Sequence, residues 1–320
     1  MTQTTGDGTY TFKHRPDLHT IPSQAISHEV NLHTSFAIDQ REGFGHIYYT
    51  LPEVGIIQIA PDMTMQTVIP IEMPYRAMNF HSTRIAHLNG VPHFFLSANE
   101  NEKVVVMTMA GEHVFTWHRP TLAPYSEDEQ ATYKPTDSVL VDGQLFVADG
   151  YGSDYVAVVD ANDKTWQTLF GGHTDNRLEN GKFRTAHNIA RTPDGEQLII
   201  ADRWNSRFQV HDYDGTYSHS YHLPYNAWVC SIDFIKWRGQ SLGIVACLYD
   251  EDEGKKRPAP LYVVDAGSFE ILATLRPKED LGIEQAQRLH NAVWHVHDDS
   301  LYIIAHAWNP GYFFVLEQVS

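Results

Sequence analysis

The sequence has 320 residues, of which 42% are hydrophobic, and a chain of this length can bury a substantial core. It carries 23 basic and 40 acidic residues, which gives a formal net charge of −17. Because phosphate groups repel so acidic a protein, we expect neither nucleic acid nor an anionic membrane as a partner.

The amino-terminal stretch and the cysteine count point to a compartment. The sequence MTQTTGDGTYTFKHRPD has neither the basic start nor the apolar stretch of a secretory signal. No uncharged apolar run approaches the roughly 18 residues of a membrane-spanning helix. The two cysteines, Cys230 and Cys247, are too few for a disulfide framework. We therefore expect a reduced, cytoplasmic protein.

Six passages share one pattern: apolar strand, turn, apolar strand, polar loop, apolar strand. In chain order they begin at His33, His81, Thr136, His187, Cys230 and His290, about 50 residues apart. Their strands are rich in Val, Ile, Tyr and Phe, as half-buried and central β-strands are. Because no unit can bury both faces alone, the repeat predicts an all-β fold. That fold is a six-bladed β-propeller, with four-stranded antiparallel blades around a central channel.

The whole chain, 1–320, is expected to form this single propeller domain. Residues 1–32 precede the first repeat, and we expect one of their strands, Tyr10–Lys13 or Ala25–Asn31, to close the ring on the last blade. The only stretch with some helical periodicity is Ile283–Leu289. An open β-sandwich would account for the strand pattern but not for the repeat.

Three histidines are spaced by two repeats each. His81, His187 and His290 open blades two, four and six, and alternate blades of a six-fold ring lie about 120° apart. Their imidazoles should therefore converge on the axis as three legs of a tetrahedron. The fourth position stays free for water or substrate, as in catalytic zinc sites. His33 opens blade one in the same alignment and is an alternative ligand or a neighbour in the pocket.

The fourth repeat carries a recognisable motif. ADRWNSRFQVHDYDG, residues 201–215, contains the D-R-x-N-x-R loop before an apolar strand and a D-x-x-G turn. In this it resembles the NHL-repeat propellers, and within them the peptidyl-α-hydroxyglycine α-amidating lyases and their bacterial relatives. The resemblance covers roughly residues 30–317. It implies a six-bladed propeller that holds zinc in its channel, on the positions of His81, His187 and His290, and splits a carbinolamide into an amide and glyoxylate.

Two loops match the lyases at their active site. The D-G-Y of blade three ends at Tyr151 and the D-R-x-N of blade four contains Arg203, at equivalent places in adjacent blades. The resemblance implies a base role for Tyr151 and a substrate contact for Arg203. A nearby cation and guanidinium favour an ionised phenol, and the arginine fork suits a carboxylate. Alternatively, Tyr151 packs in the fold and Arg203 pairs with Asp202 or Asp149.

The chain departs from the lyases at two positions. Their arginine in the equivalent loop of blade one is replaced here by Thr50 or Leu51, so Arg84, Arg41 or Arg76 would have to take its place. An aspartate that helps to bind calcium is replaced by Asn291, so calcium is not expected. His306 aligns with Asp202 and is a further pocket candidate. The expected substrate-binding residues are thus Arg203, His306, Arg84 and His33.

Together these features predict a zinc-dependent lyase, with another divalent transition metal as the alternative ion. The expected substrate is a small polar or carboxylated metabolite in which a C–N or C–O bond breaks. Two alternatives remain open. One is a metallohydrolase that uses metal-bound water at the same site, and the other is a non-catalytic NHL-type binding propeller.

Overall fold

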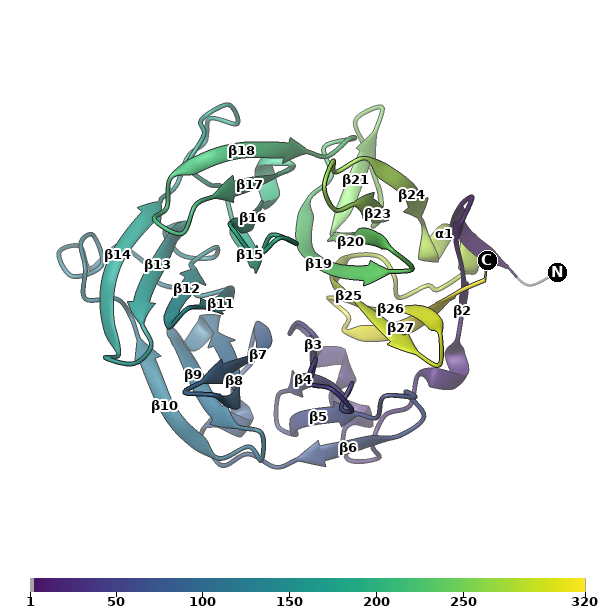
Figure 1. Cartoon of the computed structure of the whole chain (residues 1–320), viewed down its shortest axis with the longest axis horizontal. Coiled ribbons are helices and arrows are strands. Elements are labelled where there is room, and N and C mark those ends of the chain that lie inside the picture. Colours follow the sequence, from purple (N-terminus) through teal and green to yellow (C-terminus); the bar gives the residue numbers. More distant parts are fainter. Residues whose placement is uncertain (1–2, 320) are drawn as a thin grey trace.

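The computed structural model describes residues 3–319 and has the predicted all-β architecture, with six sheets in a ring around a common axis (Figure 1). Blade one consists of β3 (Ala37–Ile38), β4 (Ile47–Leu51), β5 (Gly55–Ile59) and β6 (Gln66–Ile69). Blade two consists of β7 (Ser82–Leu88), β8 (Val91–Ala98), β9 (Lys103–Thr108) and β10 (His113–His118). Blade three consists of β11 (Asp137–Val141), β12 (Gln144–Ala148), β13 (Tyr155–Asp160) and β14 (Thr165–Gly171).

The second half of the ring follows the same order. Blade four consists of β15 (Ala186–Arg191), β16 (Leu198–Asp202), β17 (Arg207–His211) and β18 (Tyr217–His222). Blade five consists of β19 (Val229–Trp237), β20 (Gln240–Cys247), β23 (Leu261–Asp265) and β24 (Ile271–Leu275), with the inserted hairpin β21 (Tyr249–Asp252) and β22 (Lys255–Pro258). Blade six begins with β25 (Leu289–His297), β26 (Ser300–Ala307) and β27 (Tyr312–Gln318). All neighbouring strands within the blades are antiparallel.

The amino terminus closes the ring, as predicted. β2 (Tyr10–His14) pairs with β27, and β1 (Thr4–Asp7) adds a further strand, so blade six has five strands and not four. In Figure 1 the purple amino-terminal strand lies beside the yellow carboxy-terminal blade. The other closing candidate is not a strand, because Ile26–Asn31 forms a 3₁₀ helix.

The one α-helix of the described residues is α1 (Pro277–Leu281). This helix ends at Leu281, because Gly282 adopts a left-handed conformation that terminates it. The stretch with some helical periodicity, Ile283–Leu289, follows the helix and is not itself helical. Within residues 3–319, no helix is long and apolar enough to cross a membrane.

The hydrophobic core is divided into six clusters, one at each junction between neighbouring blades. Between blades two and three, for example, Phe95 and Val104 pack with Leu145 and Val147. Each sheet is therefore covered on both faces, which is why its middle strands are continuous apolar runs. This burial holds the innermost strands at fixed positions around the axis.

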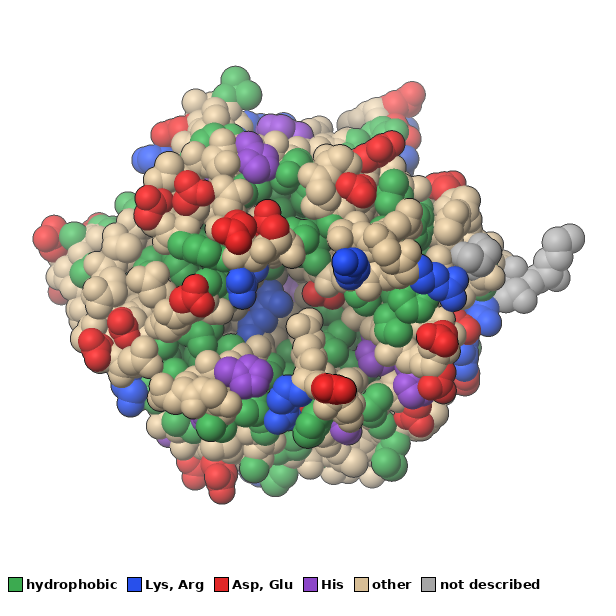
Figure 2. Space-filling model, in the orientation of Figure 1, with side chains coloured by type: hydrophobic (Ala, Val, Ile, Leu, Met, Phe, Trp, Pro, Cys, Tyr) green, Lys and Arg blue, Asp and Glu red, His purple; other side chains and the backbone are tan. Residues whose placement is uncertain are grey.

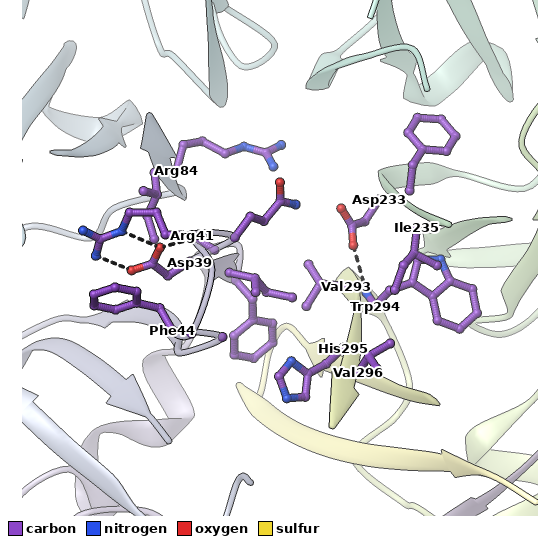
Figure 3. Close-up of a pocket in the computed structure, with 18 of the residues that line it drawn as sticks. Asp39, Arg41, Phe44, Arg84, Asp233, Ile235, Val293, Trp294, His295 and Val296 are labelled. Atoms are coloured by element: carbon purple, nitrogen blue, oxygen red, sulfur yellow. Dashed lines mark hydrogen bonds and ion pairs between the residues drawn. The ribbon is translucent and has the colours of Figure 1, made fainter. Parts of the chain in front are cut away.

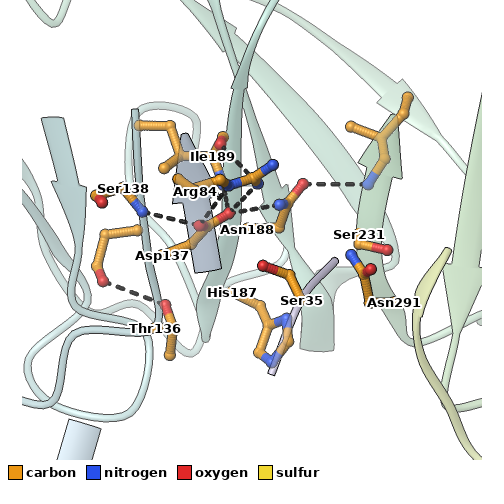
Figure 4. A network of polar contacts seen from close by, with 12 residues as sticks. Ser35, Arg84, Thr136, Asp137, Ser138, His187, Asn188, Ile189, Ser231 and Asn291 are labelled. Atoms are coloured by element: carbon orange, nitrogen blue, oxygen red, sulfur yellow. Dashed lines mark hydrogen bonds and ion pairs between the residues drawn. The ribbon is translucent and has the colours of Figure 1, made fainter. Parts of the chain in front are cut away.

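A ring of short polar side chains joins the innermost strands (Figure 4). Each accepts a backbone N–H of the next blade: Ser35 from Thr83, Asp137 from Ile189, Asn188 from Ile232, Ser231 from Ala292, and Asn291 from Phe36. At the sixth junction the hydroxyl of Ser82 has no partner within residues 3–319. The cavity inside this polar ring measures about 10 Å³, roughly the space of one water molecule. The polar ring thus divides the channel into two ends.

Candidate metal and catalytic site

Tyr151 is brought to one end of the channel by a tight loop between β12 and β13. Its neighbour Gly150 lies so close to blade four that a Cβ atom there would be 2.2 Å from the carbonyl oxygen of Ala186. The buried Asp149 fixes the loop, because its carboxylate accepts the hydroxyl of Tyr125 at 2.6 Å and the backbone N–H of Ser153 at 2.7 Å. Burial raises the pKa of Asp149 to about 7.

Arg203 follows β16 in the corresponding loop of blade four. The buried Asp202 organises this loop by pairing with Arg207, whose Nε lies 2.7 Å from the carboxylate, and by accepting the amide of Asn205. Arg203 therefore does not pair with either aspartate. Its Nη1 donates to the hydroxyl of Tyr151 at 3.1 Å, and its Nη2 lies 3.4 Å from Sγ of Cys230. Its Nε has no partner within residues 3–319.

The three histidines of alternate blades do converge. The ring centroids of His81, His187 and His290 are 4.7 Å, 4.7 Å and 4.8 Å apart, so they form a nearly equilateral triangle. All three side chains are buried. Each histidine lies within one residue of the start of its strand, β7, β15 or β25. The arrangement of the blades therefore brings the three rings together.

The hydrogen bonds behind two of these rings fix their tautomers. Nδ1 of His81 lies 2.6 Å from the carbonyl oxygen of Thr136, and Nδ1 of His187 lies 2.7 Å from that of Cys230. A carbonyl can only accept, so each Nδ1 carries the proton and each Nε2 presents a lone pair. The two Nε2 atoms face each other at 3.1 Å.

Two facing lone pairs repel each other, and a cation bound between them would remove this repulsion. Ligands 2.0–2.1 Å from a tetrahedral zinc ion are about 3.3–3.4 Å apart, close to the separation of these two Nε2 atoms. Both ring nitrogens of the buried His290 lack a partner within residues 3–319, so it has a nitrogen free for an ion. His81 and His187 therefore present two ligand atoms at a separation that suits a divalent transition metal, and the carbonyls behind them orient these two rings.

His33 joins this cluster from blade one. Its ring centroid lies 4.7 Å from that of His81 and 4.6 Å from that of His290, and it stacks on Trp308 at 5.3 Å. Among residues 3–319, His33, His81 and His290 are the group of three whose ligand atoms all lie within 4.8 Å of one another, so these three could hold a metal ion. The two possible ligand sets share His81 and His290 and differ in the third histidine.

The structure corrects the alignment of His33. In blades two to six the residue of the polar ring directly follows the residue that opens the repeat, as Ser82 follows His81. In blade one the ring residue is Ser35, so Thr34 and not His33 is the counterpart of His81. His33 reaches the cluster from one residue earlier. Asn79 donates to its Nδ1 at 3.3 Å, which leaves the proton of the neutral ring on Nε2.

The histidines are neutral in this environment. Burial lowers the pKa of His81 to about 3, and it lowers the pKa values of His33, His187 and His290 well below the ordinary value. The positive charge of Arg203 acts in the same direction on the pKa values of His81 and His187. Neutral imidazole is the form that binds a metal, so the site needs no proton to leave it before an ion enters.

Tyr151 lies between the histidines and Arg203. Its hydroxyl is 3.1 Å from Nε2 of His187 and accepts the hydrogen bond from Arg203. Burial raises the pKa of Tyr151, and Arg203 opposes this only in part. The guanidinium of Arg203 lowers the pKa of Tyr151, as expected, but by less than burial raises it. Ionisation of this phenol near neutral pH therefore requires a further positive charge.

Two other predicted pocket residues lie away from this cluster of ligands. His306 is fully buried behind His290, with ring centroids 5.4 Å apart, and burial lowers its pKa to about 4. Arg84 lies three residues beyond His81 on β7, on the other side of the polar ring, where it pairs with Asp137. It therefore does not replace the missing arginine of blade one. Asn291 stands where the lyases have an aspartate that helps to bind calcium. Its side-chain oxygen accepts the N–H of Phe36.

Several residues of the site were not anticipated. Trp308 and Asn79 border His33, and the backbone carbonyls of Thr136 and Cys230 orient the two ligands. The carbonyls have no side-chain signature. A signal did exist for the polar ring, because a short polar residue follows each residue that opens blades two to six.

Known proteins share this fold, although no family model and no curated protein matches the sequence. The chain is similar to the structure of streptogramin B lyase (TM-score 0.56, 12% identity, 90% of this chain and 94% of that chain). It is similar to luciferin-regenerating enzyme (TM-score 0.57, 12% identity, 89% and 91%). It is also similar to the β-propeller domain of Cps50 (Swd1) from Myceliophteria thermophila (TM-score 0.56, 11% identity, 90% and 84%). Such low identities establish the β-propeller fold alone, and the likeness to amidating lyases stays a prediction from the motifs.

Proposed function

We propose that this protein is a metal-dependent lyase for a small polar or carboxylated metabolite, in which a C–N or C–O bond breaks. The observation that supports this best is the convergence of buried, neutral histidines beside the Tyr151–Arg203 pair. A binding module has no need for such a set. Among the neighbours in fold are proteins named as a lyase and as an enzyme, which is compatible with catalysis on this scaffold.

The proposed ligands are His81, His187 and His290, with zinc or another divalent transition metal. His187 is preferred over His33 because its Nδ1–H is held by a carbonyl and its Nε2 faces that of His81. In His33 the contact from Asn79 places the proton on Nε2 instead. His33 would then border the substrate, stacked on Trp308.

The chain's own groups would act on a substrate hydroxyl next to a carboxylate. A bound divalent cation supplies positive charge that polarises the substrate's hydroxyl or carbonyl oxygen and favours the phenolate of Tyr151. Tyr151 removes the hydroxyl proton, and a C=O bond forms as the C–N or C–O bond breaks. The departing atom takes up the proton. The free Nε of Arg203 gives it a donor for the carboxylate beyond those already engaged.

Metal content tests the proposal first. Purified protein should contain about one divalent transition metal ion per chain by elemental analysis, and His81→Ala should lose it. The matched control is His87→Ala, an exposed histidine on the same strand, which should keep the ion. If the wild-type protein binds no such metal at stoichiometric level, the proposal is wrong.

Isotope labelling separates a lyase from a hydrolase at the same site. A panel of α-hydroxy and α-amino carboxylates, including an N-acyl-α-hydroxyglycine, would be incubated with metal-loaded protein in water enriched in ¹⁸O. A lyase forms the new C=O from the substrate's own oxygen, whereas a hydrolase inserts the label during bond cleavage. Since product aldehydes exchange oxygen with water, the label is read in the first turnovers.

A further inference from the structure

A wide vestibule occupies the other end of the channel, beyond the polar ring. Two hollows of about 880 and 870 Å³ share Gln40, Arg84, Ile85, His87, Asp233 and Phe234, so they form one space. Small-molecule sites typically measure about 300–1,000 Å³. Figure 2 shows a hollow at the centre of the ring with basic side chains inside it and acidic side chains around it.

Two charged side chains stand at the same level on opposite walls. Arg84 is the third residue after His81 in blade two, and Asp233 is the third residue after Cys230 in blade five. Blades two and five lie half a turn apart in a six-fold ring, so these residues face each other across the axis. Figure 3 shows both side chains directed into the space between their strands.

Each of these groups retains unused capacity. Arg84 is held by Asp137 through Nε at 2.8 Å and through Nη2, and within residues 3–319 its Nη1 has no acceptor. Asp233 accepts the N–H of Trp294 at 2.9 Å, but no described Lys, Arg or His lies within ion-pair distance of it. Burial raises the pKa of Asp233 to about 6, although the N–H of Trp294 and the positive charge of Arg84 act in the opposite direction.

The walls between the two charges are apolar. Ile85, Phe234 and Val293 line the vestibule beside them. A ligand that fits carries a cation for Asp233, an anion for Nη1 of Arg84, and a hydrocarbon part between them. A ligand with only an anionic group would leave Asp233 without a cationic partner, and one with only a cationic group would leave Nη1 of Arg84 without an acceptor.

We propose that the vestibule is a second ligand site, specific for a small zwitterion whose ammonium group meets Asp233 and whose carboxylate meets Arg84. It lies beyond the metal site, and the polar ring separates the two. The proposal does not depend on the lyase assignment. Binding here should occur whether or not a metal ion is held by the histidines.

Calorimetric titration with three matched probes tests this site: 5-aminopentanoate, pentanoate and pentylamine. The zwitterion should bind at least tenfold more tightly than either single-charge probe, a difference of about 1.4 kcal/mol. Asp233→Asn keeps an oxygen for the N–H of Trp294 but removes the charge. It should weaken binding of the zwitterion at least tenfold and leave that of pentanoate unchanged.

Two further variants complete the test. Arg84→Lys loses the fork that binds both Asp137 and a carboxylate, and should weaken pentanoate and the zwitterion but not pentylamine. Asp298→Asn, at an exposed turn of blade six, and His81→Ala, in the metal site, should change none of the three affinities. Failure of all probes to bind at millimolar concentration would overturn the proposal. So would equal affinities for zwitterion and pentylamine, or a zwitterion affinity unchanged in Asp233→Asn.

Discussion

Tyr151 reaches the histidines because the residue before it has no side chain. The backbone of blade three passes so close to the carbonyl of Ala186 at Gly150 that no Cβ atom fits there. This contact also fixes the distance between blades three and four at the level of the site. A residue with no chemical role therefore determines where the proposed base stands.

Replacing that glycine should disturb both stability and activity. Gly150→Ala is expected to lower the free energy of unfolding by about 1–3 kcal/mol, because the blades must move apart. Gly267→Ala is the control, since the nearest atom to its added Cβ is 3.5 Å away. It should change stability by less than about 0.5 kcal/mol in denaturant titrations. Equal effects of the two substitutions would contradict this account.

Removing the phenolic oxygen should separate chemistry from metal binding. Tyr151→Phe is expected to keep its metal ion and to lower kcat by about 10²–10⁴-fold on any panel compound that the wild-type protein converts. Tyr155→Phe, in the same blade, should retain full turnover. A Tyr151→Phe variant with undiminished kcat would exclude the phenol as the base.

The repeat in the sequence predicted the histidine cluster and could not predict every neighbour. A period of two blades places His81, His187 and His290 at one level of the axis, whatever the loops do. Arg84 was misplaced because three residues along an extended strand amount to about 10 Å along the channel. His33 was aligned with His81, although Thr34 is its true counterpart. The first strand of blade one, Ala37–Ile38, is so short that its alternating pattern does not fix the alignment.

Blade six is the element on which the ring depends, because it is made from both ends of the chain. Phe12 of β2 is fully buried and lies against Trp294, with ring centroids 6.2 Å apart. It belongs to the same apolar cluster as Leu242 and Leu261 of blade five. The amino-terminal strand thus contributes to the core and not only to an edge.

Truncating this side chain should destabilise the whole protein. Phe12→Ala is expected to lower the free energy of unfolding by about 3–5 kcal/mol, as large-to-small changes in a core do. Ile26→Ala lies in the same amino-terminal segment but is 62% exposed, so its effect should stay within about 0.5 kcal/mol. Urea titrations followed by tryptophan fluorescence measure both. A small effect of Phe12→Ala would mean that the strand does not help to hold the ring together.

The stability of the molecule should depend on pH through Asp233. Its folded pKa of about 6 lies above the ordinary value of 3.8, so the folded state binds the proton more tightly than the unfolded state. This contribution is present in full below about pH 4 and is lost as pH rises through 6. Relative to Asp233→Asn, the wild-type protein should lose about 2.4 kcal/mol between pH 4 and pH 7. Parallel stability profiles of the two proteins would contradict the assignment.

Metal binding should stabilise the entire ring, because the proposed ligands come from blades two, four and six. At a free metal concentration of 100 times Kd, the free energy of unfolding should rise by about 2.7 kcal/mol. Zinc should therefore raise the Tm of wild type and of His87→Ala, and a chelator should lower it again. His81→Ala should not respond. A Tm that zinc leaves unchanged in the wild-type protein would argue against a site preformed in the fold.

The closure of blade six also sets an order of events in the cell. His81 and His187 leave the ribosome long before His290, and blade six is complete only when β27 has emerged and paired with β2. Until then the first two ligands are spread over an open arc of blades. A nascent chain that lacks β27 therefore cannot hold the proposed ion in its final geometry, so loading of that ion would follow closure of the ring.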